Sequence, residues 1–517
     1  MGRQQIIVIG AGIGGLTAGA LLARQGFQVT VLEAHVYPGG CAGTFYHQGY
    51  RFDAGATVAG GFQEGGPHQI AGDLLGIQWN IKPLEPAWVI QTPQTTITRW
   101  RDESRWAEER AAKLPALRSF WGVQARAAQA AWNFAARLPE FPPASLMDMG
   151  RLALKIRPDL VPVSPLALMR MGSLLDLLQV KDQTARTFID AQLLISAQTT
   201  SAYANALYGA IAVDLPRVGV YHVRSGIGSL AQQLAESLRQ HGGDLIYRHA
   251  VTRIERCAGG AFRLYTNKGR TFEADAVIAN LTPWALVNLL GDSAPESLQR
   301  ETRQRPETWG AFTLYLGVSE RVLPEQADHY QIIQDPTAPL GEGNSVFVSI
   351  SDREDNKRAP DGMRALTLST HTRIAPWWEL RQSDPEGYQA RVARYRDRML
   401  AGAEMAIPGL RRAASLVLPG TPAAFYRFTR RPGGMVGGFP LTNLFRVRGP
   451  HTGIPHLWLV GDSIFPGQST AGVTAGALRV AADVTRAFAD RKFWVGRAQS
   501  TIRAGAPSPS SPPVQTR

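Results

Sequence analysis

The sequence has 517 residues but only two cysteines, Cys41 and Cys257. Two cysteines are too few for a disulfide framework or a four-cysteine zinc site, and we expect no metal site. One bridge between the two is an alternative, but we favour two free thiols in a reducing compartment. A chain of this length buries a core large enough to fold without such cross-links.

Long apolar runs are also scarce, and only residues 6–23 approach the length of a membrane-spanning helix or a signal peptide. Five of these 18 residues are glycine, which is a poor composition for a continuous helix. Ile6 stands where a myristoylation signal requires Ser or Thr. We therefore expect a cytoplasmic protein without a membrane-spanning helix.

Acidic residues are outnumbered, because 55 Lys and Arg oppose 42 Asp and Glu and give a net charge of +13. Residues 405–460 contain seven arginines and no acidic residue. Such a balance favours nucleic acid, anionic lipid or phosphorylated small molecules, although a solvated basic face is an equally good interpretation. No zinc-finger spacing, lysine-rich block or aromatic RNA-binding signature accompanies the arginines, so we expect no nucleic acid partner.

Familiar catalytic motifs are missing as well. The sequence has no G-x-S-x-G nucleophile elbow, no H-E-x-x-H zinc helix and no Walker loop. The catalytic side chains are therefore unknown, and the pattern favours chemistry that resides in a cofactor.

What the sequence does contain is a dinucleotide-binding motif near its start. The β-branched run 6–9 predicts a buried parallel strand, and Gly10, Gly12 and Gly15 then complete a G-x-G-x-x-G pattern. The first glycine permits a tight turn, the second lets backbone approach a pyrophosphate, and the third lets a helix pack closely on the strand. Glu33 ends a second predicted strand, where its carboxylate can accept hydrogen bonds from ribose hydroxyls.

A second motif of this kind lies near the other end of the chain. The apolar run 456–460 ends in Gly461 and Asp462, and residues 474–490 predict a helix. A strand that ends at a helix start presents an anion site, and Asp462 can accept from polyol hydroxyls such as a flavin's ribitol chain. An extended flavin dinucleotide needs two distant elements of this type, whereas a simple nicotinamide dehydrogenase does not need the second.

Residues 38–42, residues 100–106 and residues 461–472 carry a resemblance to a known family. Over almost its full length the sequence resembles the carotenoid desaturase and carotene isomerase branch of the amine oxidase-like flavoproteins. It is most similar to the bacterial carotenoid 3',4'-desaturases.

This resemblance implies that the cofactor is FAD. In the family, the residue at Glu33 binds the adenosine ribose, the loop of Gly39 and Gly40 passes near the flavin, and Val251 lies beside the adenine through its backbone. The predicted cofactor-binding residues are Gly10, Gly12, Gly14, Gly15, Glu33, Gly39, Gly40, Val251, Gly461, Asp462, Gly472 and Val473.

The fold class that follows is α/β, with a Rossmann-like FAD-binding domain and an inserted α+β substrate domain. We expect three chain segments to build the FAD-binding domain, namely residues 1–75, 216–295 and 445–492. The substrate domain, with an antiparallel sheet and a helical lid, is expected from residues 76–215 and 296–444. Proline and serine near the end predict a disordered tail over residues 493–517.

The lid contains a basic segment, residues 146–178, that is rich in methionine and leucine and includes Arg151, Lys155 and Arg157. This composition suits peripheral contact with an anionic membrane surface, and it suits buried core packing equally well.

The resemblance implies a desaturase that removes hydrogens from a polyene end group, so the expected partner is a hydrophobic carotenoid. Quinone or oxygen would accept the electrons from the reduced flavin. The nearest alternative is a carotene cis–trans isomerase, which uses the same fold without net oxidation. An amine oxidase-like enzyme, or a non-enzymatic prenyl-protein binder of the GDP-dissociation-inhibitor type, is a more distant alternative.

Overall fold

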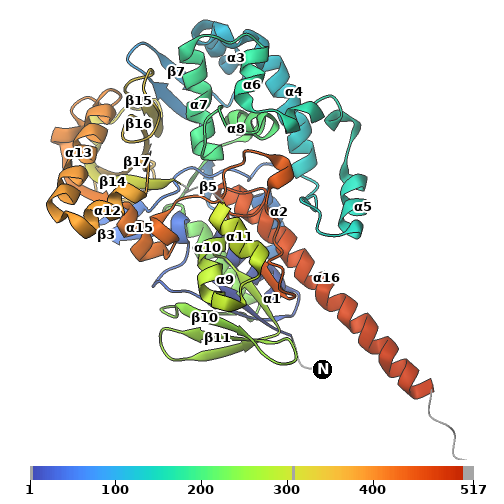
Figure 1. Ribbon diagram of the computed structural model, residues 1–517. Helices are drawn as coiled ribbons and strands as arrows, with labels where there is room; N and C mark the ends of the chain where they lie inside the picture. The colour runs from blue at the N-terminus through green and yellow to red at the C-terminus, as the bar shows by residue number, and fades with distance from the viewer. Residues whose placement is uncertain (1–3, 305–308, 505–517) are drawn as a thin grey trace, which may run out of the picture.

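The computed structural model describes residues 4–304 and 309–504, and it is built around two sheets (Figure 1). The first is a parallel five-stranded sheet with the order β19-β13-β1-β2-β9. Apart from the edge strand β9, which is only partly buried, its strands are short, largely apolar and mostly buried, as expected for a parallel sheet covered on both faces. They are β1 (Gln5–Ile9), β2 (Gln28–Leu32), β9 (Asp244–Ile246), β13 (Ala276–Ala279) and β19 (Leu457–Leu459).

Helix α1 (Ile13–Arg24) lies at the centre of this unit and is buried on nearly every side. It packs against α9 (Gly228–Gln240) and α16 (Ser469–Ala504), which come from distant parts of the chain. A small antiparallel sheet of β10 (Val251–Arg256), β11 (Phe262–Thr266) and β12 (Thr271–Ala274) lies at one edge of the molecule (Figure 1). The α/β class and the Rossmann-like unit are therefore confirmed.

The second sheet has seven strands in the order β18-β14-β17-β16-β15-β6-β7. Its centre is antiparallel, as predicted, and β14 pairs with β17 along its whole length. Residues 76–215, which we expected to be largely helical, also contribute the hairpin of β6 and β7 to this sheet. The strands are β6 (Trp88–Gln91), β7 (Thr96–Arg99), β14 (Gly310–Ser319), β15 (His329–Ile333), β16 (Ser345–Ile350), β17 (Met363–Thr372) and β18 (Ala414–Gly420).

Helices gather around one end of this sheet and form the lid (Figure 1). The lid helices are α3 (Glu103–Lys113), α4 (Arg118–Ala135), α5 (Leu146–Lys155), α6 (Met171–Leu177), α7 (Gln183–Ala197) and α8 (Ala206–Val218). All of these helices except α5 bury side chains in one apolar cluster, which includes Trp88 of β6 and Phe188 of α7. On the opposite side of the sheet lie α12 (Ala375–Ser383), α13 (Pro385–Glu404) and α15 (Pro422–Thr429).

The last helix corrects the prediction made for the end of the chain. Helix α16 continues to Ala504, so residues 493–504 are helical where we expected disorder. Glycine occurs once and proline is absent in this stretch, so nothing in it breaks the helix. The proline and serine residues that suggested a tail belong to residues 505–517, which lie outside the described residues.

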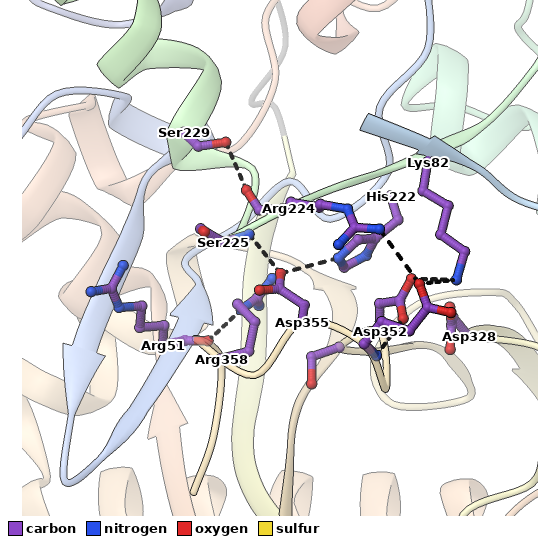
Figure 2. Close-up of polar contacts among 12 residues, drawn as sticks. Arg51, Lys82, His222, Arg224, Ser225, Ser229, Asp328, Asp352, Asp355 and Arg358 are labelled. Atoms are coloured by element: carbon purple, nitrogen blue, oxygen red, sulfur yellow. Dashed lines mark hydrogen bonds and ion pairs between the residues drawn. The ribbon is translucent and has the colours of Figure 1, made fainter. Parts of the chain in front are cut away.

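A buried polar junction joins the two units where the chain crosses between them (Figure 2). Here β5 (Ile81–Pro83) pairs with β8 (Tyr221–Val223), and the loop after β16 packs beneath them. Lys82 and Arg358 each form an ion pair with an aspartate, and His222 lies within hydrogen-bonding distance of another, which offsets the cost of burying these groups. The pairs are Lys82–Asp352 at 3.0 Å, His222–Asp355 at 3.3 Å and Arg358–Asp53 at 3.1 Å.

Candidate functional site

A cavity of about 1700 Å³ lies between the two units. Residues from both ends of the chain line it, including Gly12 after β1 and Asp462 after β19. The structure thus brings the two sequence motifs together. Every predicted cofactor-binding residue except Gly15 faces this cavity: Gly10, Gly12, Gly14, Glu33, Gly39, Gly40, Val251, Gly461, Asp462, Gly472 and Val473.

The glycine turn after β1 leaves no space for side chains. A Cβ atom on Gly15 would lie 2.3 Å from the carbonyl oxygen of Gly10, so α1 approaches the strand as closely as predicted. A Cβ atom on Gly12 would lie 2.6 Å from Nδ2 of Asn280, at the end of β13. Gly10 has a φ of +93°, which is costly for other residues. The turn therefore presents bare backbone to the cavity.

Glu33 lies directly after β2 and is held by backbone groups. Its Oε2 accepts a hydrogen bond from Ala11 N at 2.6 Å, and its Oε1 accepts one from His35 N at 2.7 Å. Burial raises the pKa of Glu33, and these backbone hydrogen bonds oppose that rise only in part. The carboxyl group is thus locked in place at the cavity wall, while its contact with a ribose stays a prediction.

The glycine loop of residues 38–43 folds back onto the first motif. Gly39 N donates to Ala11 O at 2.8 Å, and Gly39 forms an isolated bridge with Gly12. Gly39 has a φ of +119°, and a Cβ atom there would meet the backbone of Gly43 at 2.8 Å. Two glycine-rich turns therefore lie side by side along one wall of the cavity.

The carboxy-terminal motif closes the same end of the cavity. A Cβ atom on Gly14 would lie 3.3 Å from Gly461 N, so β19 ends next to the start of α1. A Cβ atom on Gly472 would lie 2.5 Å from Gly467 O, where the chain turns into α16. Both helices therefore begin at the cavity, and their N-termini favour negatively charged groups there.

Arg431 is a site residue that our sequence reasoning did not single out. Its Nη2 lies 3.0 Å from Oδ2 of Asp462, and its Nε donates to Met435 O at 3.0 Å. Burial alone would lower the pKa of Arg431, but Asp462 and Cys41 together outweigh burial and raise it. The guanidinium is therefore a permanent positive charge in the cavity wall. The sequence did contain an indication of this role, because Arg431 lies in residues 405–460, which contain seven arginines and no acidic residue.

The remainder of the cavity has a different lining. Helices α4 and α8 contribute mainly apolar side chains, such as Trp132, Leu207 and Ile211. The strands of the seven-stranded sheet contribute hydroxyl, amide and imidazole groups: Thr313, Gln331, Ser345, Ser369, Thr370 and His371. Among the described lining residues the carboxylates are Glu33, Glu64 and Asp462, and none of them comes from the lid or this sheet.

One hydrogen-bond relay in this sheet reaches the cavity wall. Ser349 Oγ donates to Thr57 Oγ1 at 2.7 Å, and His329 Nδ1 lies 2.9 Å from Ser349 Oγ. Burial lowers the pKa of His329 to about 3, so its imidazole is neutral. Because the serine hydroxyl proton points to Thr57, Nδ1 carries the imidazole proton and donates to the serine oxygen. Thr57, which lines the cavity, accepts from Ser349, so its own hydroxyl proton is not used in this bond.

These features test whether the site fits a flavin dinucleotide. The site combines two turns that exclude side chains with the N-termini of α1 and α16 and the fixed guanidinium of Arg431. This combination suits an extended anionic cofactor. The carboxylates of Glu33 and Asp462, which both line this cavity, suit hydroxyl groups. The residues present therefore fit FAD, with room left in the cavity for an apolar ligand.

Comparison with known proteins gives consistent results. The model of the flavin containing amine oxidoreductases matches residues 159–485, and that of an NAD(P)-binding Rossmann-like domain matches residues 8–69. The chain is 29% identical to prolycopene isomerase of Arabidopsis thaliana over 95% of this chain and 84% of that protein. It is 28% identical to hydroxyneurosporene desaturase of Cereibacter sphaeroides over 92% of this chain and 95% of that protein.

Among solved structures, an oxidoreductase from Methanosarcina mazei superposes with a TM-score of 0.62 at 17% identity. The match covers 92% of this chain and 99% of that one, which shows a common fold. Over residues 4–304 and 309–504, no helix has both the length and the apolar character needed to cross a membrane.

Proposed function

The chain belongs to the family of flavin containing amine oxidoreductases, and from this premise we propose that it desaturates a carotenoid. The family confirms FAD as the cofactor and an FAD-dependent oxidoreductase as the enzyme class. We assign the reaction to the 3',4' bond of a carotenoid end group, the activity implied by the sequence resemblance. When bound, the flavin supplies the acceptor for the hydrogens removed from the substrate.

One observation carries this proposal, namely that a predominantly apolar chamber is continuous with the cofactor wall. Apolar side chains of α4 and α8 face the same cavity as Gly12 and Asp462. A long polyene has almost no hydrogen-bonding groups, so it needs shape and apolar contact rather than charge. An amine substrate would need an anionic partner, and the described lining residues of the lid and sheet provide no carboxylate.

The protein's own residues hold the cofactor and keep water away. We assign Glu33 to the adenosine ribose, Val251 to the adenine and Asp462 to the ribitol chain of FAD, with Arg431 holding Asp462 in place. We also propose the three-segment division of the FAD-binding domain, in which Glu33, Val251 and Asp462 would each come from a different segment. Trp132 and its apolar neighbours would exclude water from the reacting part of the polyene.

A carotene cis–trans isomerase is the second candidate, because the chain is 29% identical to a prolycopene isomerase and 28% identical to a hydroxyneurosporene desaturase. The two reactions differ in mass balance, because a desaturase removes two hydrogens per new double bond and an isomerase removes none. Both reactions use an apolar chamber beside the flavin. The product therefore decides between them.

The test is incubation of the flavin-loaded protein with a panel of carotenoids dispersed in detergent and in liposomes. We expect a product that is two hydrogens lighter and absorbs at longer wavelength, with a quinone or oxygen as electron acceptor. A product of unchanged mass would identify the isomerase, and no conversion of any carotenoid would overturn both candidates. Glu33→Ala serves as the cofactor control and should lower flavin occupancy.

We also propose that the protein works at the cytoplasmic side of a membrane as a peripheral protein. Its substrate class partitions into lipid, and its net charge of +13 favours an anionic surface.

A further inference from the structure

Helix α5 is amphipathic, but its two faces are reversed relative to a helix on the surface of a water-soluble protein. Leu146 and Leu154 are each 85% exposed and Met147 is 70% exposed, whereas Asp148 is 8% exposed. Water favours the opposite arrangement, with leucine buried and aspartate exposed. The outer face of α5 is therefore suited to an apolar environment.

The inward polar face of α5 is held by specific contacts, so the orientation of the helix is well defined. Oδ1 of Asp148 accepts a hydrogen bond from Nη2 of Arg151 at 2.7 Å, and Ser145 caps the helix start through Asp148 N at 3.1 Å. Nζ of Lys155 donates to Oε2 of Glu140 at 2.7 Å. The Asp148 contacts lie within the helix and its cap, whereas Arg151 and Lys155 both reach Glu140 of the preceding segment. Rotating α5 to bury its leucines would break these contacts with Glu140.

The exposed apolar surface continues beyond the helix. Figure 1 shows α5 at the margin of the molecule, beyond the end of α4 and away from both sheets. The turns η3 (Pro158–Leu160) and η4 (Ser164–Leu168) follow it. Beyond the helix, Ile156 is 53% exposed, Val161 65% and Leu168 77%, and Met149 within the helix is 55% exposed. So many exposed large apolar side chains within one short stretch mark an interaction surface.

This surface adjoins the proposed substrate chamber. The residues that lead into α5 and those that follow it both line the cavity, among them Leu138, Phe141, Leu160 and Ala167. Helix α5 thus forms the tip of a lobe whose two connections form part of the cavity wall. A ligand that enters beside this tip would reach the cavity without crossing the polar surface of the protein.

We propose that residues 146–170, here called the docking segment, insert into an anionic lipid bilayer and form the entrance through which the substrate leaves it. The apolar face would enter the boundary between headgroups and acyl chains, as interfacial helices do. Arg157 and Arg170 are exposed in the same segment and suit anionic headgroups. The entrance role rests on the proposed carotenoid function, while the docking role does not.

The first test measures binding without any substrate. The flavin-loaded protein is floated with vesicles of phosphatidylcholine that contain phosphatidylglycerol, and with vesicles of phosphatidylcholine alone. We expect stronger binding to the anionic vesicles and about a tenfold lower partition coefficient for Leu154→Glu. Leu177→Glu is the matched control, since Leu177 is 68% exposed on α6 and should bind like the wild type.

The second test separates docking from catalysis. Leu154→Glu should keep its flavin occupancy and its turnover of carotenoid in detergent, but lose most of its turnover of carotenoid in liposomes. If the wild type converts no carotenoid in detergent either, the proposed function fails, while the vesicle result still decides the docking role.

Three outcomes would overturn the proposal. One is equal vesicle binding by Leu154→Glu and the wild type, and another is equal binding to anionic and neutral vesicles. The third is self-association in solution that Leu154→Glu abolishes, because a second copy of the chain would then be what covers the apolar face.

Discussion

The two halves of the cavity are built by different means. The cofactor half is backbone, with glycines packed so closely that an added methyl group would collide with main-chain atoms, and with charges held in fixed pairs. The substrate half is formed by side chains from lid helices and strands, several of them only half-buried. Backbone contacts cannot relax around a larger residue, whereas side chains can repack. The comparison thus predicts an intolerant cofactor half and an adaptable substrate half.

The largest effect is expected for Gly15→Ala. Its Cβ would lie 2.3 Å from Gly10 O and 2.9 Å from Cβ of Asn280, so α1 must move away from β1. We expect flavin occupancy to be lost and the free energy of unfolding to fall by about 3 kcal/mol, measured by absorbance and denaturant titration. Gly122→Ala is the control, because no atom lies within 4 Å of a Cβ there, and it should be neutral or stabilising.

A smaller loss of flavin occupancy and stability is expected for Arg431→Met, which removes the ion-pair partner of Asp462. Removing one member of a mostly buried ion pair lowers the free energy of unfolding by about 3 kcal/mol. Because Asp462 would then no longer be held in place, we also expect weaker flavin binding. Arg263→Met, in the solvent-exposed pair with Glu273, should leave both the stability and flavin binding close to those of the wild type. Equal losses of stability and of flavin binding in the two variants would show that the cofactor half is no less tolerant of substitution than the exposed surface.

Ile211→Trp tests the substrate half by narrowing it from α8. We expect the KM for a carotenoid to rise several-fold with flavin occupancy unchanged, because Ile211 lines the cavity away from the glycine turns. Ile211→Val keeps the shape of the wall and should behave like the wild type. A loss of flavin in Ile211→Trp would show that the two halves are not independent.

The smallest effect is expected for Thr57→Val, which removes the end of the relay from His329. Losing one hydrogen bond of about 1 kcal/mol should lower kcat about fivefold or shift the flavin absorption spectrum. Thr57→Ser keeps the hydroxyl and should restore both. An unchanged spectrum together with unchanged kcat would show that the relay serves packing alone.

The cofactor half was largely predictable because its signals are local. Strand, glycine turn and carboxylate follow one another within residues 6–33, and their spacing alone indicates a dinucleotide site. Asn280 and Arg431 were not singled out, because each comes from another part of the chain and reaches the site only through folding. The hairpin of β6 and β7 was missed for a similar reason, since its short strands are stabilised by pairing with β15.

The sequence by itself determined the nucleotide-binding unit, the need for its two ends to meet, and the antiparallel strands of the second sheet, because regular spacing and alternation are properties of neighbouring residues. Only the tertiary structure decided which way α5 faces. The composition of residues 146–178 suited a membrane surface and a buried core equally. Contacts of Arg151 and Lys155 with residues that precede the helix, Leu138 and Glu140, turn the leucines outward, and contacts between groups so far apart leave no local pattern in the sequence.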